Sequence, residues 1–177
     1  LEYFFPEDAW GWKQGAASEL AAKDLLASFD GVTVNRPLPI VDAGLGIDYF
    51  ATEKKENSPS RYFAVQVKTT PGQKSDAPSL ALPSIEIVTA QHLQTQTHSV
   101  IEEKEYKNTE SFLRMRKGVT ELNKRVRTPI HSLLVTIPSY AFLKNSYTRA
   151  LRIKPDHKAI WNEHLKNRWY DILRQSS

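Results

Sequence analysis

Two short stretches that alternate apolar and polar residues constrain the fold of this chain most strongly. The first spans residues 46–50 (GIDYF), and the second, after a polar loop, spans residues 62–69 (YFAVQVKT). Both are rich in β-branched and aromatic residues, which predicts two β-strands. Because side chains alternate along a strand, Gln66 and Lys68 share one face, and the two valines beside them face the other way. If the strands pair, Asp48, Gln66 and Lys68 converge on one patch.

The remaining sequence predicts a single domain that mixes helices with a β-sheet. Pro37 and Pro39 cannot both lie in a central ladder, so residues 32–41 are expected to form an irregular strand near the sheet edge. Residues 42–46 are expected to form a turn. Hydrophobic periodicity predicts helices over 13–29, 90–93, 110–127 and 156–174, strands over 84–88 and 147–153, and a buried central strand over the apolar run 130–137.

Glu19 stands out in the predicted helix over residues 13–29. It falls on the apolar stripe of that helix, and a carboxylate there costs free energy unless something satisfies it. One interpretation is a boundary residue that reaches solvent or pairs with a nearby lysine. The other is a carboxylate aimed at the edge of an active site.

The predicted helix over residues 110–127 is amphipathic and basic. Met115 and Val119 lie on its apolar stripe. The basic residues on the rest of its surface have three interpretations: a solvated face, the polar side of a membrane-surface helix, or a set of phosphate contacts. The membrane interpretation is the weaker one, since the core needs the apolar stripe. The candidate nucleic-acid-binding residues are Arg114, Arg116, Lys117, Lys124, Arg125 and Arg127.

Charge is distributed unevenly along the chain. Residues 1–103 carry 8 Lys and Arg against 14 Asp and Glu, whereas residues 104–177 carry 16 against 6, for a net charge of +4. This split suggests an acid-bearing catalytic half and a second half that faces a polyanion. Alternatively, the two halves neutralise each other in the fold.

The composition also excludes several classes of protein. The chain has no cysteine, so disulfides and thiolate metal sites are excluded. No apolar run approaches transmembrane length, and neither GxGxxG nor GxxxxGK[ST] occurs. We therefore expect a cytoplasmic protein of one domain over residues 1–177, with no membrane partner and no nucleotide cofactor.

Glu19, Asp48 and the pair Gln66-x-Lys68 follow one another in the order helix, strand, strand. With GID at 46–48 and VQVKT at 65–69, this order resembles the PD-(D/E)XK, or restriction-endonuclease-like, nuclease superfamily, with Gln66 replacing the second acid. It is similar to small uncharacterised prokaryotic domains of that superfamily, and to Gln-x-Lys variants among transposon end-cleaving and homing nucleases. The resemblance covers mainly residues 13–70. It implies an α/β (α+β) fold, a mixed central sheet flanked by helices with core order αβββαβ. Residues 89–128 would be a basic helical insertion or elaboration.

The resemblance also implies a metal site and a set of roles. Mg²⁺ or Mn²⁺ would be bound by Asp48, the amide oxygen of Gln66 and the backbone carbonyl of Val67. Glu19 would contact the metal through water, and Lys68 would stand beside the attacking water. With Gln66 in place of an acid the site carries less negative charge, which implies weaker metal binding or a single metal.

These features support one main hypothesis and two alternatives. The main hypothesis is a metal-dependent DNA endonuclease of restriction, defence, repair or mobile-element type, acting on double-stranded DNA. Cleavage of both strands would favour a homodimer, because one site cuts one strand. The first alternative is an inactive nucleic-acid-binding module with the nuclease fold. The second is a protein–protein module that assembles through Trp10 and Trp12.

Overall fold

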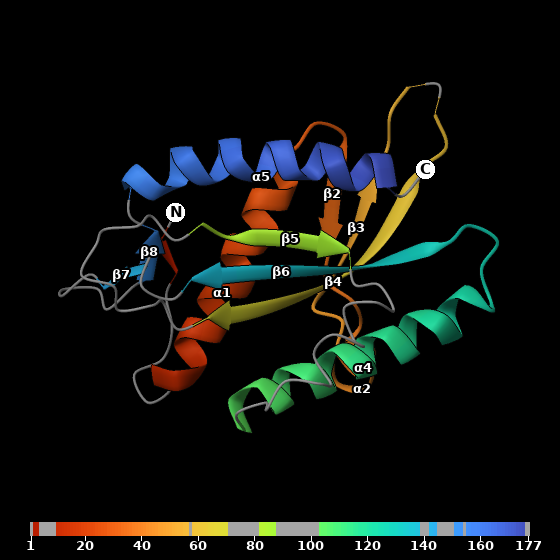
Figure 1. The fold of residues 1–177 in the computed structure, drawn as a ribbon, viewed down its shortest axis with the longest axis horizontal. Coiled ribbons are helices and arrows are strands. Elements are labelled where there is room, and N and C mark those ends of the chain that lie inside the picture. The colour runs from red at the N-terminus through yellow and green to blue at the C-terminus, as the bar shows by residue number, and fades with distance from the viewer. Residues whose placement is uncertain are drawn as a thin grey trace.

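The computed structural model describes residues 2–3, 10–56, 58–70, 82–87, 103–138, 142–144, 151–153 and 155–175. Its centre is a five-stranded sheet in the order β2-β3-β4-β6-β5 (Figure 1). The strands are β2 (Val32–Asn35), β3 (Tyr49–Glu53), β4 (Arg61–Thr70), β5 (Ser84–Ile87) and β6 (Ile130–Pro138). The helices are α1 (Trp10–Ala27), α2 (Pro39–Leu45), α4 (Glu103–Asn123) and α5 (Pro155–Gln175). A second, small sheet has the order β1-β8-β7, from β1 (Glu2–Tyr3), β7 (Phe142–Lys144) and β8 (Leu151–Ile153).

The sheet is mixed, with β4 at its centre. β2, β3 and β4 form an antiparallel meander, and β5 pairs antiparallel with β6. β4 and β6 pair in parallel, from Tyr62 opposite Ile130 to Thr70 opposite Pro138. Parallel neighbours need a long crossover, and here that connection contains β5 and α4. The described elements therefore include the order αβββαβ (α1, β2, β3, β4, α4, β6), with α2 and β5 added.

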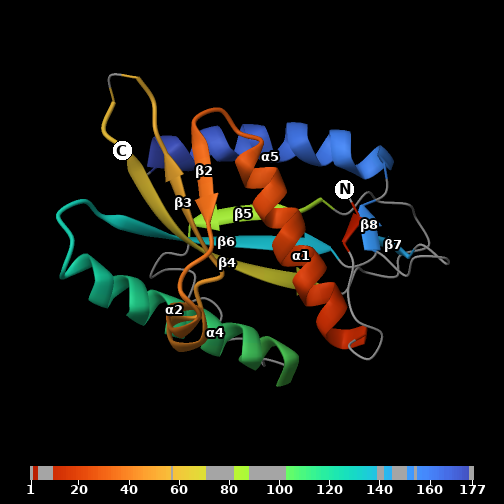
Figure 2. The ribbon, with the colours of Figure 1, turned by 180° about the vertical axis from the view of Figure 1, so that it is seen from behind.

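One face of the sheet packs against α1 and α5 (Figure 2). Phe29, in the turn that follows α1, stacks on Trp169 of α5 with ring centroids 5.5 Å apart, and the ring centroid of Phe63 in β4 lies 5.0 Å from that of the same tryptophan. Such aromatic pairs add about 0.5–1.5 kcal/mol each beyond their buried area. The aromatic cluster thus fixes α5 across the sheet.

The other face packs against α4, beside which α2 lies in both ribbon views (Figures 1 and 2). Met115 and Val119 of α4 are buried against Ala64 of β4, and Leu134 of β6 packs on the same cluster. α4 lies in the segment expected to be an insertion, and it contributes to the core on this face.

Several predictions are confirmed. A mixed α+β chain with a mixed five-stranded sheet is observed, as are the strands at 62–69, 84–88 and 130–137 and the helices near the two ends of the chain. β2 lies at the sheet edge, as the prolines indicated. The predicted helix at 90–93, and residues 147–150 of the predicted strand, lie outside the described residues. Within the part of the chain that is described, no helix is long and apolar enough to cross a membrane.

The expectation of a strand over 38–41 followed by a turn over 42–46 was wrong. The segment is helix α2, which begins at Pro39, where the fixed φ of proline suits the first helical position. It ends at Gly46, whose backbone is left-handed (φ 66°, ψ 35°) and whose N–H donates to the carbonyl of Asp42. The strand expected from Gly46 consequently begins only at Tyr49.

The predicted bounds of the basic helix were also wrong. α4 begins at Glu103 rather than near residue 110, and it ends at Asn123 rather than at 127. The Asn123 amide accepts the Ile130 N–H at 2.8 Å and donates to the Ile130 carbonyl at 3.0 Å. This side chain holds the helix end against the first residue of β6, so Lys124, Arg125 and Arg127 lie in the connection between them.

Gly118 sets how closely α4 approaches α2, and replacing it should destabilise the protein. A Cβ at this position would lie 2.9 Å from the Cβ of Leu45. We expect Gly118→Ala to lower the free energy of unfolding by about 1–2 kcal/mol, because overpacking outweighs the better helix propensity of alanine. Chemical denaturation measures this change.

Gly15→Ala is the matched control, because no described atom lies within 4 Å of a Cβ added in the middle of α1. It should stabilise the protein by about 0.5–1 kcal/mol. A stabilised Gly118→Ala would show that α2 is not held close to α4.

Candidate active site

Asp48 lies in the short connection between α2 and β3. Its N–H donates to the carbonyl of Val65 at 2.9 Å, and its side-chain Oδ2 accepts the N–H of Val67 at 2.6 Å. The Ile47 side chain packs in the cluster beneath α4, whereas Tyr49 packs in the opposite core. The aspartate therefore marks the point where the chain enters the sheet, and its carboxylate lies against the Gln66–Val67 peptide.

The side chains of β4 alternate as predicted. Val65 and Val67 pack in the core below α1 and α5, and Ala64 packs on the α4 side, the side that Gln66 and Lys68 share by alternation. Gln66 is 3% exposed and Lys68 is half-buried. In the sheet register Gln66 is paired with Leu134 of β6.

The amide oxygen of Gln66 is the unusual atom of this site. It is buried and finds no hydrogen-bond donor among the residues that the structure describes. An unsatisfied buried acceptor of this kind costs about 1–3 kcal/mol. Glu53 carries a similarly unpaired buried oxygen, but its charge is compensated by Arg61 at 3.3 Å and Lys55 at 3.9 Å. Gln66 Oε1 is thus a buried acceptor that could take a cation, on the residue that precedes the Val67 N–H bound by Asp48.

Burial moves the two ionisable groups of the site toward their neutral forms. Desolvation raises the pKa of Asp48 to about 7, against the lowering effect of the Val67 hydrogen bond. Desolvation also lowers the pKa of Lys68, which the nearby Asp48 charge opposes. A lysine with a lowered pKa is more often neutral near pH 7 and can then accept a proton. A carboxylate with a raised pKa is stabilised in its ionised form by a bound cation.

Glu19 and a carboxylate that the sequence did not indicate, Asp42, complete the acidic surroundings. Glu19 is half-buried on α1, and desolvation raises its pKa. Asp42 lies in the first turn of α2, and its negative charge raises the pKa of both Glu19 and Asp48. The signal that could have identified Asp42 is the Pro39 and Gly46 pair, which marks a helix and carries Asp42 toward the start of β3.

The donor atoms fit one hard cation held by few charges. In the described ranges no three His, Asp or Glu side chains are grouped closely enough to hold a metal ion. The fitting set is instead the Asp48 carboxylate, the unsatisfied Gln66 oxygen and the Val67 carbonyl. In a strand the N–H and C=O of one residue point to the same side, so the Val67 carbonyl lies on the side of β4 from which Asp48 binds the Val67 N–H. Oxygen donors of this kind suit Mg²⁺ or Mn²⁺.

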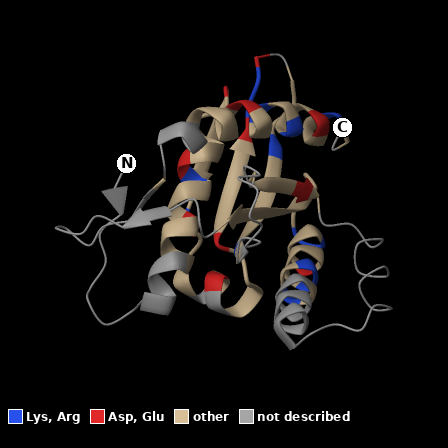
Figure 3. Cartoon of the chain, turned by 60° about the vertical axis from the view of Figure 1, so that its left-hand side comes forward, with Lys and Arg blue, Asp and Glu red and all other residues tan. Residues whose placement is uncertain are grey.

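The basic residues extend from the site along α4 and beyond it (Figure 3). All six are exposed. Arg114 is near enough to Lys68 for its charge to lower the lysine pKa. From Arg114 to the end of α4 the helix rises about 14 Å, at 1.5 Å per residue. Lys124, in the connection that follows, is paired with Glu121 at 2.6 Å.

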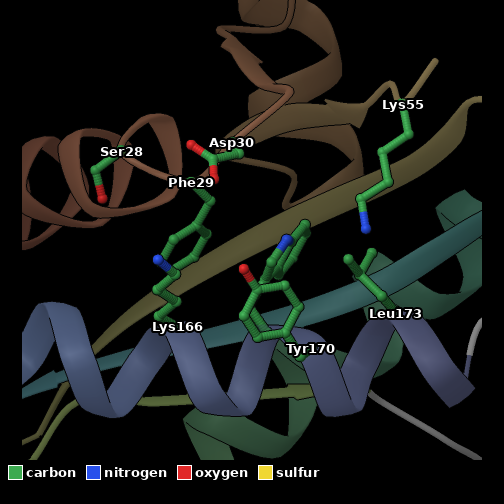
Figure 4. Close-up of a pocket in the computed structure, with 8 residues that line it drawn as sticks. Ser28, Phe29, Asp30, Lys55, Lys166, Tyr170 and Leu173 are labelled. Carbon is green, nitrogen blue, oxygen red and sulfur yellow. The ribbon is translucent and has the colours of Figure 1, made fainter.

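A separate pocket of about 90 Å³ lies between the end of α1, the loop after β3 and α5 (Figure 4). Phe29, Trp169 and Tyr170 supply aromatic walls, and Lys55 and Lys166 lie at its edge. None of the predicted catalytic residues lines this pocket. The structure brings Asp48 to the Val67 N–H, next to Gln66 in the chain, and places Lys68 and Glu19 within electrostatic range of Asp48.

Comparison with protein-family models, with curated proteins and with solved structures found no match for this chain.

Asp48→Asn should stabilise the protein at pH 8 and leave it unchanged at pH 4. The folded-state pKa is raised from 3.8 to about 7, so the wild type loses stability as pH rises through this window, and the asparagine variant does not. The difference in the free energy of unfolding at pH 8 should be on the order of 3 kcal/mol in EDTA. Urea denaturation at both pH values measures it.

The exposed Asp30→Asn is the control and should show no such gain. Mg²⁺ at pH 8 should then stabilise the wild type but not Asp48→Asn. Equal stability of wild type and Asp48→Asn at pH 8 would contradict a buried Asp48 with a raised pKa.

Proposed function

We propose that this chain is a metal-dependent endonuclease that hydrolyses phosphodiester bonds in double-stranded DNA, with Mg²⁺ or Mn²⁺ as cofactor. One observation carries the proposal: Gln66 has an unsatisfied, buried amide oxygen, and the Asp48 carboxylate binds the backbone N–H of the next residue, Val67. Without a bound cation, this arrangement contributes no stability to the fold. A divalent cation would satisfy the amide oxygen and favour the ionised carboxylate together.

The residues of the site divide the work of hydrolysis. Asp48, Gln66 and the Val67 carbonyl would hold the cation, which when bound supplies positive charge to the phosphate as negative charge develops. Lys68 would hydrogen-bond the attacking water and take its proton, which its lowered pKa favours. Water adds across one P–O bond, leaving one phosphate end and one hydroxyl end.

Two features outside the site support a DNA substrate. The exposed arginines and lysines of α4 extend away from Lys68, which suits a polyanion that passes through the site. The order αβββαβ, with parallel β4 and β6, agrees with the resemblance of residues 13–70 to restriction-endonuclease-like nucleases.

Cleavage of supercoiled plasmid, and separately of branched DNA, tests the proposal directly. We expect nicking or cutting with Mg²⁺ or Mn²⁺ and none with EDTA. Lys68→Ala should slow cleavage by about 10²–10⁴-fold while leaving DNA affinity largely intact, because general acid–base groups contribute about that much. Lys54→Ala, an exposed lysine remote from Asp48, is the control.

Wild-type rates from Lys68→Ala would reject the assigned site. Salt-sensitive DNA binding without cutting would instead identify an inactive module of the same fold. Absence of both would favour a protein–protein module.

The basic residues of α4 should set the salt dependence of DNA binding. The triple variant Arg114→Ala, Arg116→Ala and Lys117→Ala should make the negative slope of log K against log salt shallower by about 2 to 3. Each lost phosphate contact removes roughly 0.9 from its magnitude. Fluorescence anisotropy over a salt series measures the slope.

A matched triple variant removes equal charge from the other side, at Lys54, Lys166 and Arg174, which are all exposed. It should leave the slope nearly unchanged. Equal slopes for both triple variants would show that α4 is not the phosphate-binding surface.

A further inference from the structure

Arg36 lies at the rim of the candidate site, in the connection from β2 to α2. Its Nη2 lies 3.9 Å from Oε2 of Glu19 and donates to the hydroxyl of Tyr49 at 3.4 Å. Its guanidinium carbon lies 5.7 Å from the centre of the Tyr49 ring. Tyr49 directly follows Asp48 and is fully buried. The tyrosine that follows the proposed metal-binding aspartate in the chain therefore positions the guanidinium.

The guanidinium also remains open to solvent. The Arg36 side chain is 62% exposed, and that of Glu19 is 37% exposed. Both of these contacts of Arg36 use the same nitrogen, Nη2, so neither of them occupies Nε or Nη1. A planar pair of N–H donors matches the oxygens of a phosphate. The same arginine can thus hold Glu19 or bind a DNA phosphate.

Glu19 is not grouped with Asp48 and Asp42 into a metal-binding set within the described ranges. Its carboxylate nevertheless lies near enough to both for their charges to interact. The charge of Arg36 offsets that of Glu19. Whatever removes Arg36 would leave Glu19 with repulsion from two carboxylates and with a stronger attraction to a cation.

We propose that Arg36 is a substrate-sensitive latch on Glu19. Without DNA, Arg36 pairs with Glu19 and keeps its charge from the cation held by Asp48 and Gln66. A DNA phosphate takes the guanidinium, and Glu19 is then available to that cation. Arg36 is a positioning residue in this scheme, and the latch rests on the proposed endonuclease function.

The geometry sets the strength of the latch. An exposed ion pair of this length changes an equilibrium by about two- to fivefold. Such a weak pair can be displaced by a phosphate that offers two hydrogen bonds. By reciprocity, DNA should tighten metal binding by the same factor that metal tightens DNA binding.

Calorimetric titration with Mn²⁺ tests the latch without relying on activity. The wild type is compared with Arg36→Gln, Glu19→Gln and the double variant, each alone and with a short phosphorothioate duplex that resists cleavage. Without DNA, Arg36→Gln should bind Mn²⁺ two- to fivefold more tightly than the wild type, and this gain should vanish in the Glu19→Gln background. The duplex should tighten Mn²⁺ binding by the wild type but not by Arg36→Gln.

Arg36→Lys keeps the charge without the planar donor pair, and should retain the weak Mn²⁺ affinity while losing most of the effect of DNA. An equal gain from Arg36→Gln with and without Glu19 would overturn the latch, because it would reflect only the field of the guanidinium. Unchanged affinity in Arg36→Gln would overturn the latch alone. Absence of Mn²⁺ binding by the wild type, with and without DNA, would overturn the proposed function and the latch with it.

Discussion

The unequal pairing of β4 is the constraint on which the rest of the structure depends. β4 pairs with β6 along nearly its whole length, but β3 begins only at Tyr49, opposite Val65. Beyond that point β3 no longer runs beside β4. The Val67 N–H, which β3 does not pair, donates to the Asp48 side chain instead. Gln66, on the face of β4 that α4 covers, is buried and has no donor for its amide oxygen among the described residues. A β3 that continued past Tyr49 would pair the Val67 N–H in the ladder and leave no place for the Asp48 side chain there.

Stability and chemistry oppose each other in this arrangement. A carboxylate whose pKa is raised to about 7 and an amide oxygen without a donor both weaken the folded state. Their cost is borne by the aromatic packing of Phe29, Phe63 and Trp169, which lies on the opposite face of the sheet. Because these two faces are separate, the core remains well packed while the Gln66 amide oxygen of the candidate site has no hydrogen-bond donor among the described residues.

Hydrophobic periodicity predicted much of this fold, because β4, β6 and α5 can each be recognised within a short window of sequence. Alternation along β4 predicted that Gln66 and Lys68 share a face, whereas Asp48 lies before β3 and contacts β4 through the Val67 N–H. α2 was missed because Leu38, Ile40 and Val41 form an apolar run that resembles a strand, although Pro39 begins a helix that Gly46 ends. Missing α2 meant missing Asp42.

Other features had no local signal at all. The contact of the Asp48 side chain with the Val67 N–H depends on where β3 begins, and the contact of Arg36 with Glu19 joins residues from different elements. These depend on tertiary register, which neither periodicity nor composition encodes.

The parallel register also determines when, during folding, the site comes into being. Gln66 is paired with Leu134, 68 positions later in the chain, so its burial must wait for a long loop to close. The β3–β4 hairpin is local and can form earlier. A partly folded chain in which β6 has not yet docked therefore carries Asp48 and Gln66 in sequence but without the burial of Gln66.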